Sequence, residues 1–120
     1  MQFMMLLYGD EAAFSGLPED AQEEAFKSFM AYNRELAEAG VLVAGSELLP
    51  SRTAVTLRGK KDQIVATDGP FAEAKEQIGG YYILSVDSRE QALEWAKKCP
   101  SVWGGAIEVR ELGTQPEELG

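Results

Sequence analysis

The stretch YYILSVDSREQALEWAKKCP, Tyr81–Pro100, decides the fold of this chain. Residues 81–84 are apolar at four successive positions, which predicts a strand covered on both faces. The letters SREQ at residues 88–91 match a capping box, so a helix is expected to begin at Ser88 and to stop at Pro100. The alternating run Ala106–Arg110 follows as a last strand. This half of the chain is therefore predicted to be strand, helix, strand.

The first half of the chain has the same order. Residues 3–8 and residues 41–44 are apolar at odd and even positions, so both are expected to be strands buried on two faces. Between them Pro18 suits a first helical turn, apolar residues recur at spacings of three and four, and Gly40 is placed to end the helix. The middle of the chain predicts a hairpin, Thr53–Arg58 and Gln63–Thr67, that turns through residues 59–62.

Two strand-helix-strand units joined by a middle hairpin predict an α+β, ferredoxin-like domain with both helices on one face of the sheet. Two helices leave the other apolar face uncovered, and a second copy of the chain is the simplest cover. We therefore expect a homodimer with sheets packed face to face, a dimeric α/β barrel. Residues 1–113 form the expected domain, and residues 114–120 form an acidic tail, either frayed or an arm on the partner.

The composition excludes several classes of function. A chain of 120 residues fits one domain, and its net charge of −9 disfavours nucleic acid and membrane surfaces as partners. The absence of His removes the usual general base and most transition-metal and haem sites, so no metal and no cofactor are expected. The single cysteine, Cys99, forms no disulfide within the chain, which makes a cytoplasmic location the default. Its apolar helical spacing favours core packing over a reactive thiol.

The stretch TDGPFAEAKE, residues 67–76, is the most distinctive motif. Asp-Gly-Pro is turn chemistry, and the favoured interpretation from the residues alone is that Asp68 caps a short helical turn that starts at Pro70, with Phe71 as its apolar anchor. The alternative interpretation is that Asp68, beside Glu73 and Lys75, presents a carboxylate to a pocket as a general acid or base.

This motif resembles the DGPF branch of the YCII-related proteins, as do GGYY at residues 79–82, ALEWA at residues 92–96 and EVR at residues 108–110. The resemblance covers nearly the whole chain and implies a dimeric α/β barrel. It also implies a link to sigma-factor signalling, because DGPF proteins are often encoded beside extracytoplasmic-function sigma factors. A His and Asp pair proposed as an active site in the wider group is matched here only on the Asp side, at Asp68.

Three functions remain open from the sequence. The first is a small dimeric protein that binds a small-molecule ligand, with a link to a sigma-factor pathway. The second is a cofactor-free acid–base enzyme on a small, aromatic substrate, with Asp68 as the catalytic proton carrier; the third is an interaction module without a pocket. The candidate ligand-binding residues are Phe71, Lys75, Tyr81 and Tyr82, of which the two tyrosines are expected on opposite faces of their strand. Further polar candidates are Asn33, which needs a backbone or ligand partner within an apolar helix face, and Glu108 with Arg110, which share a strand face.

Overall fold

Two antiparallel sheets organise the chain, whose computed structural model describes residues 1–119. The larger sheet has the strand order β2-β5-β1-β6. Its strands are β1 (Gln2–Gly9), β2 (Leu42–Glu47), β5 (Gln77–Ser85) and β6 (Ala106–Glu111). The second sheet is the hairpin of β3 (Val55–Lys60) and β4 (Gln63–Asp68). The chain is therefore an α+β domain, and all the predicted strands and the middle hairpin are confirmed.

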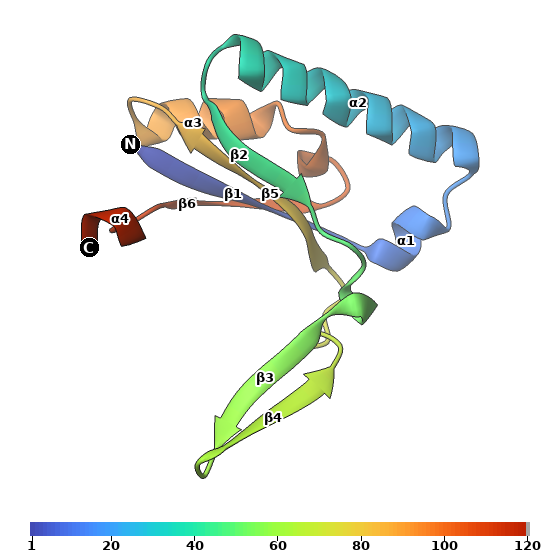
Figure 1. The fold of residues 1–120 in the computed structure, drawn as a ribbon. Helices are drawn as coiled ribbons and strands as arrows, with labels where there is room; N and C mark the ends of the chain where they lie inside the picture. Colours follow the sequence, from blue (N-terminus) through green and yellow to red (C-terminus); the bar gives the residue numbers. More distant parts are fainter. Residues whose placement is uncertain (120) are drawn as a thin grey trace.

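The long helices lie together on one face of the larger sheet (Figure 1). They are α2 (Glu19–Glu38) and α3 (Arg89–Lys97), and the chain adds the short helices α1 (Glu11–Ser15) and α4 (Pro116–Leu119) and 3-10 turns at Ser51–Thr53 and Pro100–Val102. The Ser88 side chain accepts a hydrogen bond from the Gln91 N–H, which confirms the predicted start of α3. Gly40, with a φ of 71°, follows α2 as predicted. No helix among residues 1–119 is long and apolar enough to cross a membrane.

The core lies between the larger sheet and its two helices. Alternate residues of β1 point into it, and they meet side chains from β5, α2 and α3; the buried set is Phe3, Met5, Leu7, Tyr32, Leu36, Tyr82, Leu84, Val86, Ala92, Ala96 and Cys99. Cys99 is fully buried, which confirms its interpretation as a core residue. Burial raises the pKa of its thiol, an effect that hydrogen bonds from Ser101 oppose.

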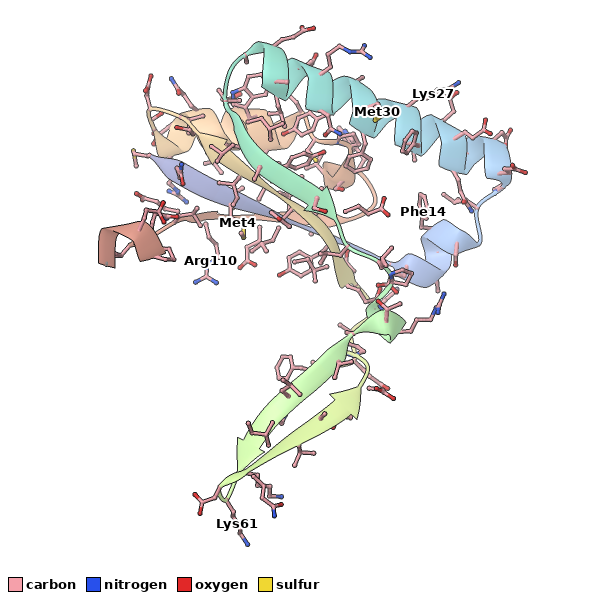
Figure 2. The ribbon with its side chains drawn as sticks, in the orientation of Figure 1. Met4, Phe14, Lys27, Met30, Lys61 and Arg110 are labelled. Atoms are coloured by element: carbon pink, nitrogen blue, oxygen red, sulfur yellow. The ribbon has the colours of Figure 1, made fainter. Side chains whose placement is uncertain are left out.

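Among the described residues, neither α2 nor α3 covers the opposite face of the larger sheet (Figure 1). Strand pairing places Met4 beside Ile83, Leu6 beside Tyr81 and Tyr8 beside Ile78, all on this face. Figure 2 shows Met4 and Arg110 on the side away from the helices. We call this surface the open face. It confirms that β1 and β5 carry apolar side chains on both sides.

Strand β2 differs from the sequence-based prediction. It is an edge strand of the sheet, every residue after Leu42 is exposed, and the side chain of Val43 is half exposed. The expectation that residues 41–44 are covered on both faces is therefore wrong for the single chain. The edge position explains the difference, because β2 has a neighbouring strand, β5, on one side only and its other side is open to solvent.

The hairpin stands apart from the domain, and we call its residues 55–68 the arm. Its turn uses Lys61 and Asp62 with φ values of 48° and 62°, the left-handed conformations of a tight two-residue hairpin turn. Neither strand pairs with the larger sheet. Figure 1 shows the arm extending from the end of that sheet on the open-face side. The radius of gyration is 16.5 Å, whereas roughly 13.6 Å is typical of a compact domain of this length.

Candidate functional site

Asp68 is the last residue of the arm, and its side chain is exposed. The next residue, Gly69, has a φ of +100°. Its N–H donates a 2.6 Å hydrogen bond to the Ala54 carbonyl, and its carbonyl accepts a 2.9 Å bond from the Thr56 hydroxyl. The Asp-Gly pair thus closes the arm where its two strands leave the domain, which fits the turn chemistry of the sequence.

The interpretation of Asp68 as a helix cap is wrong. Residues 70–76 hold bends but no helical turn. Within the part of the chain that the structure describes, no hydrogen bond or ion pair is found for the Asp68 carboxylate, so it holds no backbone N–H. Gly69 explains the outcome, because its positive φ turns the chain back to Ala54 and satisfies the backbone there without the Asp68 side chain.

Phe71 and Lys75 lie in the segment between the arm and β5 and are both exposed, Phe71 by 74%. The Arg58 guanidinium of the arm lies 5.2 Å from the centre of the Phe71 ring, a cation–π contact. Phe71 therefore packs on the side of the arm. In the single chain this places Phe71 at the arm and not at the tyrosines of β5.

The segment just before the arm is anchored to the domain by hydrogen bonds between Ser51 and Glu11. The Glu11 carboxylate accepts two hydrogen bonds from Ser51, from its N–H at 2.9 Å and from its hydroxyl at 3.0 Å. The Glu11 N–H donates to Gln77 Oε1 at 3.1 Å, and Gln77 Nε2 donates to the Ala74 carbonyl. A shallow hollow of about 350 Å³ lies beside this network, lined by Ser51, Arg52, Pro70, Glu73, Ala74 and Gln77. These contacts define the direction in which the arm leaves the sheet.

The two predicted tyrosines point to opposite faces of β5, as expected from strand alternation. Tyr82 is buried under α2, where its ring meets the Tyr32 ring edge-on at 5.4 Å and its hydroxyl donates a hydrogen bond to Asn33 Oδ1. Burial, with a smaller contribution from Cys99, raises the pKa of Tyr82 to about 12. The partner of Asn33 is thus a core hydroxyl, neither the backbone group nor the ligand expected from sequence.

Tyr81 lies on the open face, opposite Leu6 on one side and Ser46 on the other. Next to it along the face, the Tyr8 hydroxyl donates a 3.2 Å hydrogen bond to Glu108 Oε1. Glu108 and Arg110 pair with Leu6 and Met4, which confirms that both belong to one face. Tyr8 was missed as a site residue, although its parity with Met4 and Leu6 in β1 was a signal that could have found it.

The two tyrosines of the open face have small cross-strand neighbours. Small residues stand opposite the large ones, Ser46 opposite Tyr81 and Ala106 opposite Tyr8. Burial, reinforced by the hydrogen bond to the Glu108 carboxylate, raises the pKa of Tyr8 above its ordinary value. In this pair the Tyr8 hydroxyl is the donor and the Glu108 carboxylate is the acceptor.

A groove lies on the helix side of the molecule, and we call it the α1–α2 groove. It has a volume of about 520 Å³, is wide open to solvent, and is lined by Phe14, Glu19, Gln22, Glu23, Phe26, Lys27 and Glu47. Three of these residues are acidic and one is basic. Figure 2 places Phe14 and Lys27 on this side, far from Lys61 at the tip of the arm.

Among the side chains of residues 1–117, the structure brings together no group of three or more His, Cys, Asp or Glu in an arrangement that could hold a metal ion.

The chain is similar to known proteins over nearly its whole length. The family model of the YCII-related domain matches residues 1–114. An uncharacterized protein of Rhizobium meliloti (strain 1021) is 36% identical over 124 residues, which cover 99% of this chain and 98% of that protein. The fold is similar to that of 5-chloro-2-hydroxyhydroquinone dehydrochlorinase from Burkholderia phenoliruptrix, solved in complex with 2,5-dihydroxybenzoquinone, with a TM-score of 0.55, 13% identity and 98% coverage of both chains.

Proposed function

The chain belongs to the YCII-related domain family, and from that premise we propose that it binds a small aromatic ligand on the open face, between two copies of the chain. The strand order β6-β1-β5-β2, with α2 and α3 on one face, supports a ferredoxin-like protomer with the arm inserted as its middle hairpin. Membership of the DGPF branch, implied by residues 67–76, remains a prediction.

The dimer is supported by the chemistry of the open face. Met4, Leu6, Tyr81 and Ile83 form an apolar centre that spans β1 and β5. An apolar surface that continues across neighbouring strands marks an interface or a ligand site in a soluble protein. Two such faces packed together remove both from water, which is the arrangement of a dimeric α/β barrel.

The hydrogen-bonded pair of Tyr8 and Glu108 is the observation that carries the ligand site. A carboxylate enclosed between two sheets needs partners for its remaining lone pairs, and removal from water without them costs several kcal/mol. A ligand hydroxyl, or Arg110 reaching across from a second copy, supplies such a partner. The Tyr81 ring, flanked by the small Ser46, offers a surface on which an aromatic ring stacks.

The ligand class follows from these groups together. An aromatic compound with hydroxyl or carbonyl oxygens matches two aromatic rings, one acceptor carboxylate and one donor hydroxyl. The structural neighbour from Burkholderia phenoliruptrix was solved with a ligand of this kind, 2,5-dihydroxybenzoquinone, which makes that compound a suitable first probe.

An acid–base enzyme with Asp68 as proton carrier is the second candidate. The observation in its favour is that the Asp68 carboxylate has no partner among the described residues and is free to act. In the single chain it is open to solvent, so this function also needs a second copy to enclose it. The link to a sigma-factor pathway and the cytoplasmic location remain predictions from sequence.

Isothermal titration calorimetry of the protein with 2,5-dihydroxybenzoquinone and with simple phenols tests the proposal. Glu108→Gln is expected to weaken binding about tenfold, because a neutral amide accepts a hydrogen bond less strongly than a carboxylate. Glu111→Gln is the matched control, since Glu111 lies on the same strand but pairs with Phe3 on the helix-facing side. Equal affinities for the Glu108 variant, the Glu111 variant and wild type would overturn the proposed site.

A further inference from the structure

The apolar side chains Val55, Leu57 and Ile64 of the arm are exposed in the part of the chain that the structure describes, and we propose that the arm docks in the α1–α2 groove of a second copy. The proposal rests on the face-to-face dimer described above and adds a second contact to it, between the arm of each chain and the α1–α2 groove of the other. It assigns a role to the exposed hairpin and to the acidic groove, neither of which takes part in the ligand site.

The arm has one apolar and one polar face. Directly opposed residues of an antiparallel pair share a face. Val55, Leu57, Gly59, Ile64 and Ala66 therefore share one face, with Asp68 at its end beside the domain, whereas Thr56, Arg58, Lys60, Gln63, Val65 and Thr67 share the other. On the apolar face, Val55, Leu57 and Ile64 are 60%, 66% and 77% exposed. Such alternation is typical of a strand pair that packs one face against another surface.

An isolated two-stranded hairpin is marginally stable in water. Its own ladder, the hydrogen bonds at Gly69 and the contact of Arg58 with Phe71 hold the arm. Its root, in contrast, is anchored to the domain by the double hydrogen bond from Ser51 to Glu11. An arm that is anchored at its base and exposes an apolar face is expected to pack that face against another molecule.

The charge distribution favours a second copy of the chain as the molecule that packs against the arm. The arm carries three basic and two acidic residues, whereas the rest of the chain carries eight basic and eighteen acidic residues. The arm thus has a net charge of +1, on a body with a net charge of −10. Lys60 and Lys61 lie at its tip, and the groove offers Glu19, Glu23 and Glu47 beside the exposed rings of Phe14 and Phe26.

The geometry requires exchange between chains. Figure 1 places the arm on the open-face side of the sheet, α2 on the other side and α1 at the end of β1. The arm extends away from α2 and does not reach its own groove. A strand of six residues spans roughly 20 Å, and sheets packed face to face lie about 10 Å apart. An arm that leaves one sheet toward the partner therefore extends past the partner's sheet to the level of its helices. Reciprocal docking of two arms closes a two-fold dimer.

Ile64→Thr and Val65→Thr form a matched pair of tests, because the two residues are neighbours on β4 and lie on opposite faces of the arm. Both side chains are exposed in the single chain, so neither variant is expected to change its folding. In sedimentation equilibrium, Ile64→Thr is expected to raise the dimer dissociation constant about a hundredfold, about tenfold for each of two docked arms. Val65→Thr is expected to leave the dissociation constant unchanged.

The variant Leu6→Asp separates this proposal from the face-to-face dimer, because Leu6 lies at the centre of the open face. A dimer weakened by Leu6→Asp but not by Ile64→Thr overturns the arm and keeps the sheet contact. A dimer weakened by Ile64→Thr but not by Leu6→Asp keeps the arm and overturns the sheet contact. A wild-type protein that sediments as a monomer at micromolar concentration overturns both.

A charge exchange identifies the docking site. One chain carries Lys60→Glu with Lys61→Glu, and the other carries Glu19→Lys with Glu23→Lys. Each variant alone sets like charges of arm and groove against each other and is expected to dimerise more weakly than wild type, with circular dichroism as the check that both are folded. Mixed together, they are expected to form a heterodimer, because both arm-to-groove contacts are then complementary. Failure of the mixture to dimerise better than either variant alone would overturn the groove as the docking site.

Discussion

Replacement of Tyr82 by Phe tests whether this residue belongs to the core and not to a ligand site. The change keeps the ring and its edge-on contact with Tyr32 but removes the hydroxyl that donates to Asn33 Oδ1. Loss of a buried hydrogen bond typically costs about 1 kcal/mol in the free energy of unfolding. In a chain of this length, that cost corresponds to a fall in Tm of about 4 °C.

The effect of this substitution is expected to reverse at high pH. The pKa of Tyr82 is about 12 in the folded protein and 10.0 ordinarily, so the buried neutral hydroxyl stabilises the fold below pH 10. This stabilisation is lost as the pH rises through 12, since the unfolded chain ionises first, and the loss amounts to about 2–3 kcal/mol. Phe does not ionise, so the two stability curves are expected to cross near pH ~11.

Urea denaturation followed by circular dichroism measures both effects, at one protein concentration because a dimer is expected. Tyr81→Phe is the matched control, since Tyr81 lies on the open face beside Tyr82 and no hydrogen bond of its hydroxyl is found among the described residues. It is expected to stay within about 0.5 kcal/mol of wild type. The reasoning is refuted if both variants lose the same stability, or if the Tyr82 curve runs parallel to wild type between pH 8 and 12.

Substitutions at Gly45 and Asp68 test the local geometry. A Cβ at Gly45 would lie 2.8 Å from Tyr82 Cδ1 and 3.1 Å from the Tyr81 carbonyl oxygen, so Gly45→Ala is expected to lower the free energy of unfolding by about 1–3 kcal/mol. Gly79 has open space around it, so Gly79→Ala is expected to change the free energy of unfolding by less than about 0.5 kcal/mol. Equal values for the two variants in chemical denaturation would contradict this packing. Asp68→Ala and Asp68→Asn are both expected to stay within about 0.5 kcal/mol of wild type, because the carboxylate caps no helix, and a loss near 1 kcal/mol in the Ala variant alone would restore the cap.

Periodicity and end signals were sufficient for most of the fold. The capping box at Ser88 and the two-sided apolar run of residues 3–8 each identified an element that the structure contains. The short helix α1 was missed, because five residues with an Asp10 cap carry too little periodicity to stand out. The sequence predicted the hairpin but not its position in the molecule. The sequence of a hairpin determines which of its residues pair with each other, but not the surface against which they lie.

The candidate site was harder to predict because its parts are not neighbours in the single chain. Asp68 lies at the root of the arm and Tyr81 on the open face, whereas Tyr82, next to it in sequence, lies in the core. Strand alternation predicts the separation of the two tyrosines, but no local rule connects either of them with Asp68.

What the arm and the open face share is the side of the sheet on which they lie, the side without helices (Figure 1). If a second copy covers that side, one event encloses the pair of Tyr8 and Glu108 and also covers the apolar face of the arm. Ligand binding and dimer formation are then thermodynamically linked, because a ligand held between two sheets binds the dimer and not the separated chains. A compound that raises the Tm is therefore expected to lower the dimer dissociation constant as well, and one that stabilises the protein without strengthening the dimer binds elsewhere.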